Sequence, residues 1–162
     1  MTTTVTAAQS SEPGPVWAGA APPLADGFVT RAEPGDAVAA ALAPGAMVVL
    51  TSTAGPASRT TGDWQAPTGK TQLAAATALS LWARGDIEIV IWVSATSQAS
   101  VTSAYAEAAA ALEGQSSGDA TTAAARLVSW LRETARPWLV VLDDLRAGVV
   151  ADDLWPRGPA GR

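Results

Sequence analysis

One lysine stands alone in this sequence. Lys70 is the only lysine among 162 residues, and the other nine of the ten basic side chains are arginines. It lies in the run Gly69-Lys70-Thr71, directly before an alanine- and leucine-rich stretch with helical spacing. Glycine lets the backbone approach a ligand closely, and a lysine ammonium on its flexible side chain can contact a phosphate. A threonine hydroxyl can ligate Mg²⁺. The triplet predicts a phosphate-binding loop at a helix N-terminus; a surface lysine on an ordinary first turn is the alternative.

A pair of acids supplies a second element of the same chemistry. Asp143 and Asp144 directly follow the apolar residues 138–142. A carboxylate at the end of a buried strand can hold Mg²⁺, directly or through water, because this hard cation prefers oxygen ligands. We therefore predict Asp143 as a metal ligand, and Asp144 as the group that orients or deprotonates an attacking water. The alternative is a polar strand end that caps the next turn.

The composition excludes several other chemistries. The chain has no histidine and no cysteine, which removes Ser-His-Asp triads, histidine and thiolate metal sites, and disulfides. The net charge is −5 and the basic residues are scattered, so we expect no nucleic-acid partner. No apolar run has the length of a membrane span and no signal peptide is recognisable, so we expect a cytoplasmic protein without a membrane partner.

The predicted elements alternate between strands and helices. Residues 1–20 are predicted to be a disordered lead-in, and residues 21–162 to form one domain. Short apolar runs predict strands at 46–50, 87–93 and 138–142, with helices at 37–42, 71–84, 98–112 and 120–134. This alternation favours an α/β fold with a parallel sheet and right-handed crossovers. The loop that carries Lys70 follows the first strand and Asp143 ends the third, so both should emerge at one edge of the sheet.

The order of four segments resembles a known family. Phe28-Val29-Thr30-Arg31-Ala32-Glu33, Gly69-Lys70-Thr71, Ile89-Val90-Ile91-Trp92-Val93-Ser94 and Leu139-Val140-Val141-Leu142-Asp143-Asp144 are similar to successive elements of NB-ARC domains. These belong to the STAND class of P-loop ATPases, and the similarity is greatest to those of actinobacterial tetratricopeptide-repeat proteins. The second segment resembles the end of a Walker A motif and the fourth a Walker B motif.

The resemblance implies a three-layer P-loop NTPase fold with a parallel sheet, incomplete at its C-terminus. It also implies an ATP/ADP-operated signalling switch, with slow Mg²⁺-dependent hydrolysis only in a full-length protein. Its expected partners are nucleotide, downstream winged-helix and repeat domains, and further copies in a nucleotide-dependent homo-oligomer. The implied catalytic residue is Asp144, and the implied metal ligands are Thr71 and Asp143. The implied nucleotide-binding residues are Gly69, Lys70, Thr71, Gln72, Arg31 and Phe28.

Two positions depart from a full Walker A motif and keep other hypotheses open. The first glycine position holds Trp64, and Pro67 lacks the N–H that would cradle a phosphate. Gly55 can supply the missing turn only across an insertion. The alternatives are therefore a non-catalytic α/β interaction module with a degenerate P-loop, or a P-loop small-molecule kinase.

Overall fold

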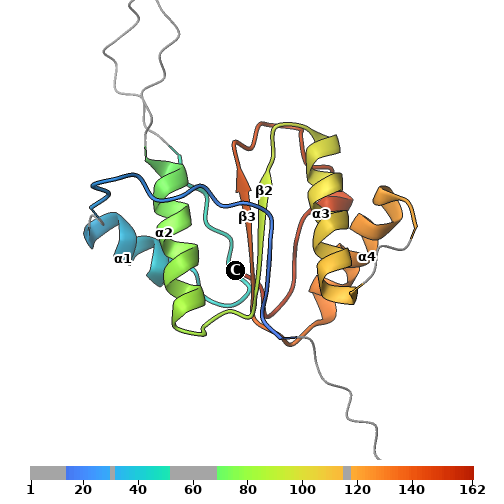
Figure 1. Ribbon diagram of the computed structural model, residues 1–162, viewed down its shortest axis with the longest axis horizontal. Coiled ribbons are helices and arrows are strands. Elements are labelled where there is room, and N and C mark those ends of the chain that lie inside the picture. The colour runs from blue at the N-terminus through green and yellow to red at the C-terminus, as the bar shows by residue number, and fades with distance from the viewer. Residues whose placement is uncertain (1–13, 30–31, 52–68, 115–117) are drawn as a thin grey trace, which may run out of the picture.

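The chain folds as a parallel sheet between two layers of helices (Figure 1). The computed structural model describes residues 14–29, 32–51, 69–114 and 118–162. In chain order the elements are β1 (Val16–Ala18), α1 (Ala32–Ala41), α2 (Lys70–Ala83), β2 (Ile89–Ser94), α3 (Gln98–Glu113), α4 (Ala120–Glu133), β3 (Trp138–Asp143) and a short 3₁₀ helix, η1 (Asp152–Leu154). The described strands lie in the order β1-β2-β3. The predicted α/β class with a parallel sheet is confirmed.

The central strand, β2, is buried on both faces of the sheet. Ile89, Ile91 and Val93 pack into a cluster with α3 and α4, whereas Val90 and Trp92 pack on the opposite face against α2. Because side chains alternate along a strand, a continuous apolar run fills both layers. Burying each such side chain contributes about 1.5–3 kcal/mol. This core holds α2 against one face of the sheet and α3 against the other.

The predicted strand at residues 46–50 is wrong. This segment forms neither a helix nor a strand, and Met47 and Val49 are 72% and 71% exposed. The C-terminal residues lie beside β3 instead: the Trp138 N–H donates to the Ala160 carbonyl at 3.2 Å, and Trp138 and Gly161 form a parallel bridge. An apolar run becomes a strand only where a partner edge is open to it.

The described sheet also contains a strand that the sequence assigned to the disordered lead-in. Val16–Ala18 forms β1 and pairs in parallel with β2, with Val16 opposite Ile89. A strand of three residues carries too little pattern to be predicted. It is held by packing, since Trp17 meets Trp82 of α2 edge to face, with ring centroids 5.4 Å apart.

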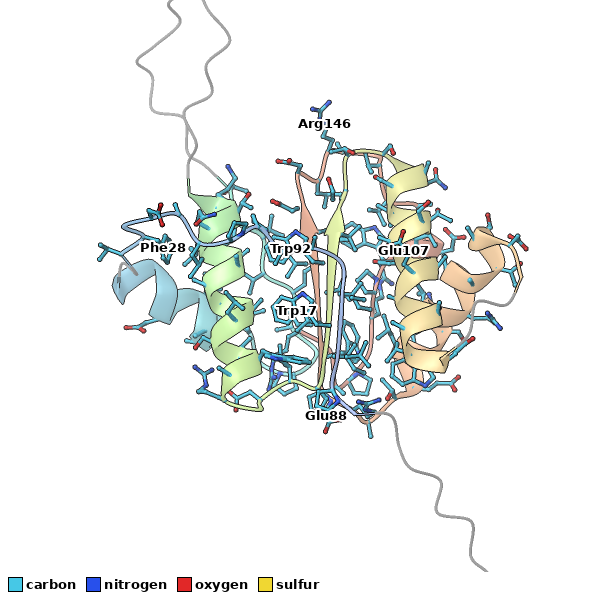
Figure 2. All side chains as sticks on the ribbon, in the orientation of Figure 1. Trp17, Phe28, Glu88, Trp92, Glu107 and Arg146 are labelled. Carbon is cyan, nitrogen blue, oxygen red and sulfur yellow. The ribbon has the colours of Figure 1, made fainter. Side chains whose placement is uncertain are left out.

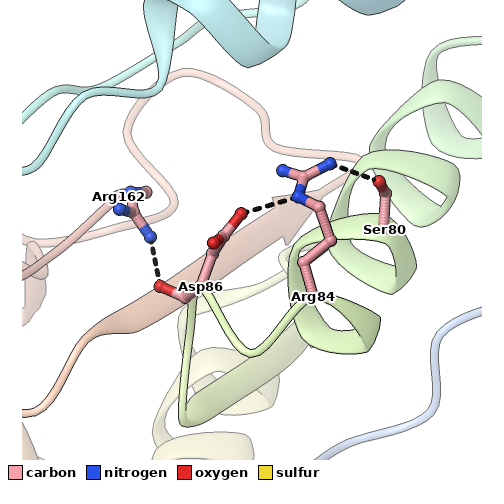
Figure 3. Close-up of polar contacts among 4 residues, drawn as sticks. All are labelled: Ser80, Arg84, Asp86 and Arg162. Atoms are coloured by element: carbon pink, nitrogen blue, oxygen red, sulfur yellow. Dashed lines mark hydrogen bonds and ion pairs between the residues drawn. The ribbon is translucent and has the colours of Figure 1, made fainter.

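Polar contacts fasten the turn between α2 and β2 to the chain end (Figure 3). Arg162 Nη1 donates to the Asp86 carbonyl at 2.7 Å, while Arg84 joins the Asp86 carboxylate at 2.7 Å and Ser80 Oγ at 2.8 Å. The residues after β3 thus include η1 and, at Arg162, a contact with the turn after α2. Within the described ranges, every helix is too short or too polar to cross a membrane.

Candidate functional site

The two predicted motifs meet at the carboxyl edge of the sheet. The Thr71 hydroxyl of α2 donates a hydrogen bond to Asp143 Oδ1 at 2.8 Å, across 72 positions of sequence. Asp143 is the last residue of β3 and Thr71 is the second of α2. Both side chains are half-buried. The prediction that the Gly69-Lys70-Thr71 run and Asp143 lie at one edge of the sheet is therefore confirmed, although the strand predicted before that run is not formed.

Gly69 sets the geometry with which α2 begins. It is the N-cap, with φ 73° in the left-handed region, and its carbonyl accepts the first helical bond from Leu73 N–H at 2.8 Å. None of the described residues lies within 4 Å of an added Cβ, whereas the positive φ is a conformation that favours glycine. Gly69 makes no side-chain cap, and the N–H groups at a helix N-terminus favour an anion.

Asp144, the second residue of the acidic pair, has a left-handed backbone conformation. Asp144 has φ 55°, the one positive value among the described non-glycine residues, and its N–H donates to Asp143 Oδ1 at 3.1 Å. The Asp143 carbonyl accepts from Ala95 N–H at 2.7 Å, which continues the β2–β3 pairing to the last residue. Aspartate tolerates the left-handed region better than most residues, and such conformations concentrate at functional sites. Asp143 is thus held half-buried at the edge while Asp144 is exposed.

The other predicted nucleotide-binding residues are placed differently. The Gln72 side chain is engaged with the main chain of the segment after β1, through Pro23 and Ala25. Phe28 belongs to that segment and lies on the α1 and α2 side of the sheet (Figure 2). Arg31 lies outside the described residues, as do Trp64 and Pro67. The structure therefore brings Gly69, Lys70, Thr71 and the acidic pair together, and connects Gln72 to the segment of Phe28.

Two residues at the same edge were not predicted. Ser94 ends β2 directly opposite Asp143 in the parallel register. Arg146 follows the acidic pair by two positions and projects from this edge, away from the sheet (Figure 2). The signal for Ser94 was its place at the end of a predicted strand, equivalent to that of Asp143. The position of Arg146 could not be predicted, because the sequence does not show in which direction the loop after a strand runs.

The donor set fits a magnesium ion that is shared with a phosphate. Thr71 Oγ1 and Asp143 Oδ1 already lie 2.8 Å apart, and both are hard oxygen ligands. The described residues contain no group of three or more acidic side chains placed to hold a metal. Magnesium is commonly held by one or two protein oxygens together with substrate phosphates and water. A hydroxyl and a carboxylate beside a helix N-terminus match that requirement, whereas the described residues form no all-protein cage.

A groove elsewhere on the surface contains none of the predicted site residues. It lies between α3 and α4 and is lined by residues that include Leu112, Trp130 and Arg136.

Comparison with known proteins yields no match to any family model, to any curated protein or to any solved structure.

Proposed function

We propose that the chain is a nucleotide-binding module of the P-loop NTPase fold, working as an ATP/ADP switch of the NB-ARC type. The observation that carries the proposal is the 2.8 Å hydrogen bond between Thr71 and Asp143. It joins a Gly-Lys-Thr triplet at a helix N-terminus to an acid at the end of a parallel strand. Neither feature alone would distinguish a phosphate site from a common helix start or strand end.

Each residue has a role that follows from its chemistry. The N–H groups at the start of α2 would hold a phosphate, and the Lys70 ammonium would neutralise its charge. Thr71 Oγ1 and Asp143 would hold Mg²⁺, which supplies charge neutralisation of the phosphates when bound. Asp144, exposed beside Asp143, would orient a water for slow hydrolysis. ATP and ADP would bias two states of a longer protein according to their difference in affinity for each state.

The test is a calorimetric titration of Mg²⁺-ADP and Mg²⁺-ATP into the chain and into Lys70→Ala. Low-micromolar binding is expected in the parent chain and a loss of at least about tenfold in the variant, because a charge-assisted phosphate contact contributes about 1.5–3 kcal/mol. Arg84→Ala is the matched control, since it removes a cation from the opposite end of the same helix. It should bind like the parent chain.

The same titration separates the alternatives. A folded parent chain that binds neither nucleotide supports the interaction module with a degenerate P-loop. Binding of ATP followed by ADP release that requires an added small-molecule acceptor supports the kinase. Equal losses in Lys70→Ala and Arg84→Ala would show that the binding detected is non-specific charge attraction, and would remove the support for a site at the start of α2.

A further inference from the structure

The segment after β1, residues 19–29, runs across α2 before it reaches α1 (Figure 1). We call it the crossing segment. The Gln72 side chain binds it through both polar atoms of its amide. Ala25 N–H donates to Gln72 Oε1 at 2.7 Å, and Gln72 Nε2 donates to the Pro23 carbonyl at 3.1 Å. One side chain thus connects two main-chain groups that lie 47 and 49 positions away in sequence.

The position of Gln72 connects this contact to the candidate site. Gln72 is the third residue of α2 and directly follows Thr71, whose hydroxyl binds Asp143. The first turn of α2 is therefore fixed to β3 by one residue and to the crossing segment by the next. Because both polar atoms of the Gln72 amide are bonded to main chain, any effect of Gln72 on a ligand would pass through the crossing segment and the helix start.

We propose that Gln72 is a positioning residue that fastens the crossing segment to the first turn of α2 and so preorganises the phosphate site. The inference rests on the proposed function, since the ligand is the same nucleotide. A segment that is already fastened costs less conformational entropy to order when a ligand binds beside it. The coupling is reciprocal, so a bound nucleotide strengthens the fastening by the same factor.

The crossing segment is held in one way near β1 and in another way at its middle. Near β1 it is anchored by packing, with Ala21 against the cluster on the α2 face and Trp17 against Trp82. At Pro23 and Ala25 it is held by the Gln72 amide. Loss of the amide should therefore release residues 23–29 and leave β1 and the tryptophan pair in place.

The experiment compares Gln72→Met with the parent chain. Methionine has nearly the same length and volume but forms neither hydrogen bond. Gln98→Met is the matched control, because Gln98 is an exposed glutamine in the first turn of a different helix. Three quantities are measured in each protein: exchange of the Ala25 amide hydrogen, the Kd for Mg²⁺-ADP, and the urea midpoint of global unfolding.

In Gln72→Met we expect Ala25 exchange to accelerate about 3- to 10-fold, because the Ala25 N–H loses its exposed hydrogen bond to Gln72 Oε1. The unfolding midpoint should fall by no more than about 0.5 M urea. The Kd for Mg²⁺-ADP should rise several-fold where both proteins are fully folded, which a loss of global stability alone would not produce. In the parent chain, Mg²⁺-ADP should slow Ala25 exchange. Gln98→Met should match the parent chain in all three quantities.

Two results would overturn the inference while leaving the proposed function standing. One is ADP binding to Gln72→Met with the parent's Kd. The other is unchanged Ala25 exchange in that variant. Failure of the proposed function has a different signature, since the parent chain itself would then bind no ADP although Ala25 exchange still depends on Gln72. That result overturns both.

Discussion

The hydrogen bond between Thr71 and Asp143 can be measured without any nucleotide. A double-mutant cycle with Thr71→Val and Asp143→Ala isolates the coupling between the two side chains. Hydrogen bonds to a charged group contribute about 1.5–3 kcal/mol when buried, and both residues here are half-buried, so we expect a coupling of about 1 kcal/mol. The hydrogen bond from Asp144 N–H to Asp143 Oδ1 is lost in both arms that carry Asp143→Ala and cancels.

The assay is urea unfolding of the four proteins at pH 7, followed by tryptophan fluorescence. With a slope of about 2 kcal/mol per molar urea, the coupling corresponds to a midpoint difference of about 0.5 M. The control cycle replaces Thr71→Val by Thr77→Val, because Thr77 lies on the same helix and its hydroxyl bonds the Leu73 carbonyl instead. If the coupling in the Thr71 cycle is no larger than in the control cycle, the contact between Thr71 and Asp143 is refuted, and with it the proposed site.

Two further predictions concern the core. Tyr105 is fully buried and its hydroxyl has no hydrogen-bond partner within the described part of the chain. Tyr105→Phe should therefore raise the free energy of unfolding by about 1 kcal/mol in urea melts, and a loss of stability would show that the hydroxyl has a partner. Burial also raises the pKa of Tyr105 above its ordinary value of 10.0. Stability from the neutral phenol is thus complete below pH 10 and declines above it, and the phenylalanine variant should lose less stability there. In Gly161→Ala the added Cβ would meet the Trp138 indole, so thermal melts should show a destabilisation of about 1–3 kcal/mol. Gly14→Ala, where none of the described residues lies within 4 Å, should melt like the parent chain, and an equal effect of both changes would contradict the clash of the added Cβ with Trp138.

The sequence pattern was enough to predict a helix or strand wherever the residues of that element show its characteristic spacing. The strands β2 and β3 and the helices α2, α3 and α4 were predicted to within about two residues at each end. Their apolar residues repeat with strand or helix spacing, and glycine or capping residues mark several ends, such as Ser97 before α3 and Gly114 after it. The chemistry of the candidate site is also local, because Gly69, Lys70 and Thr71 are consecutive and Asp143 directly follows an apolar run.

Tertiary structure decided what depends on partners that are distant in sequence. The run at 46–50 has strand composition, yet Gly161 occupies the place beside Trp138 on β3, so the run lies outside the sheet. The three residues of β1 pair only because β2 has an open edge for them. The Gln72 contacts could not be predicted, because its partners are main-chain groups present at every residue. The sequence therefore determined which groups exist and which element each belongs to, while strand pairing and packing decided which of them meet.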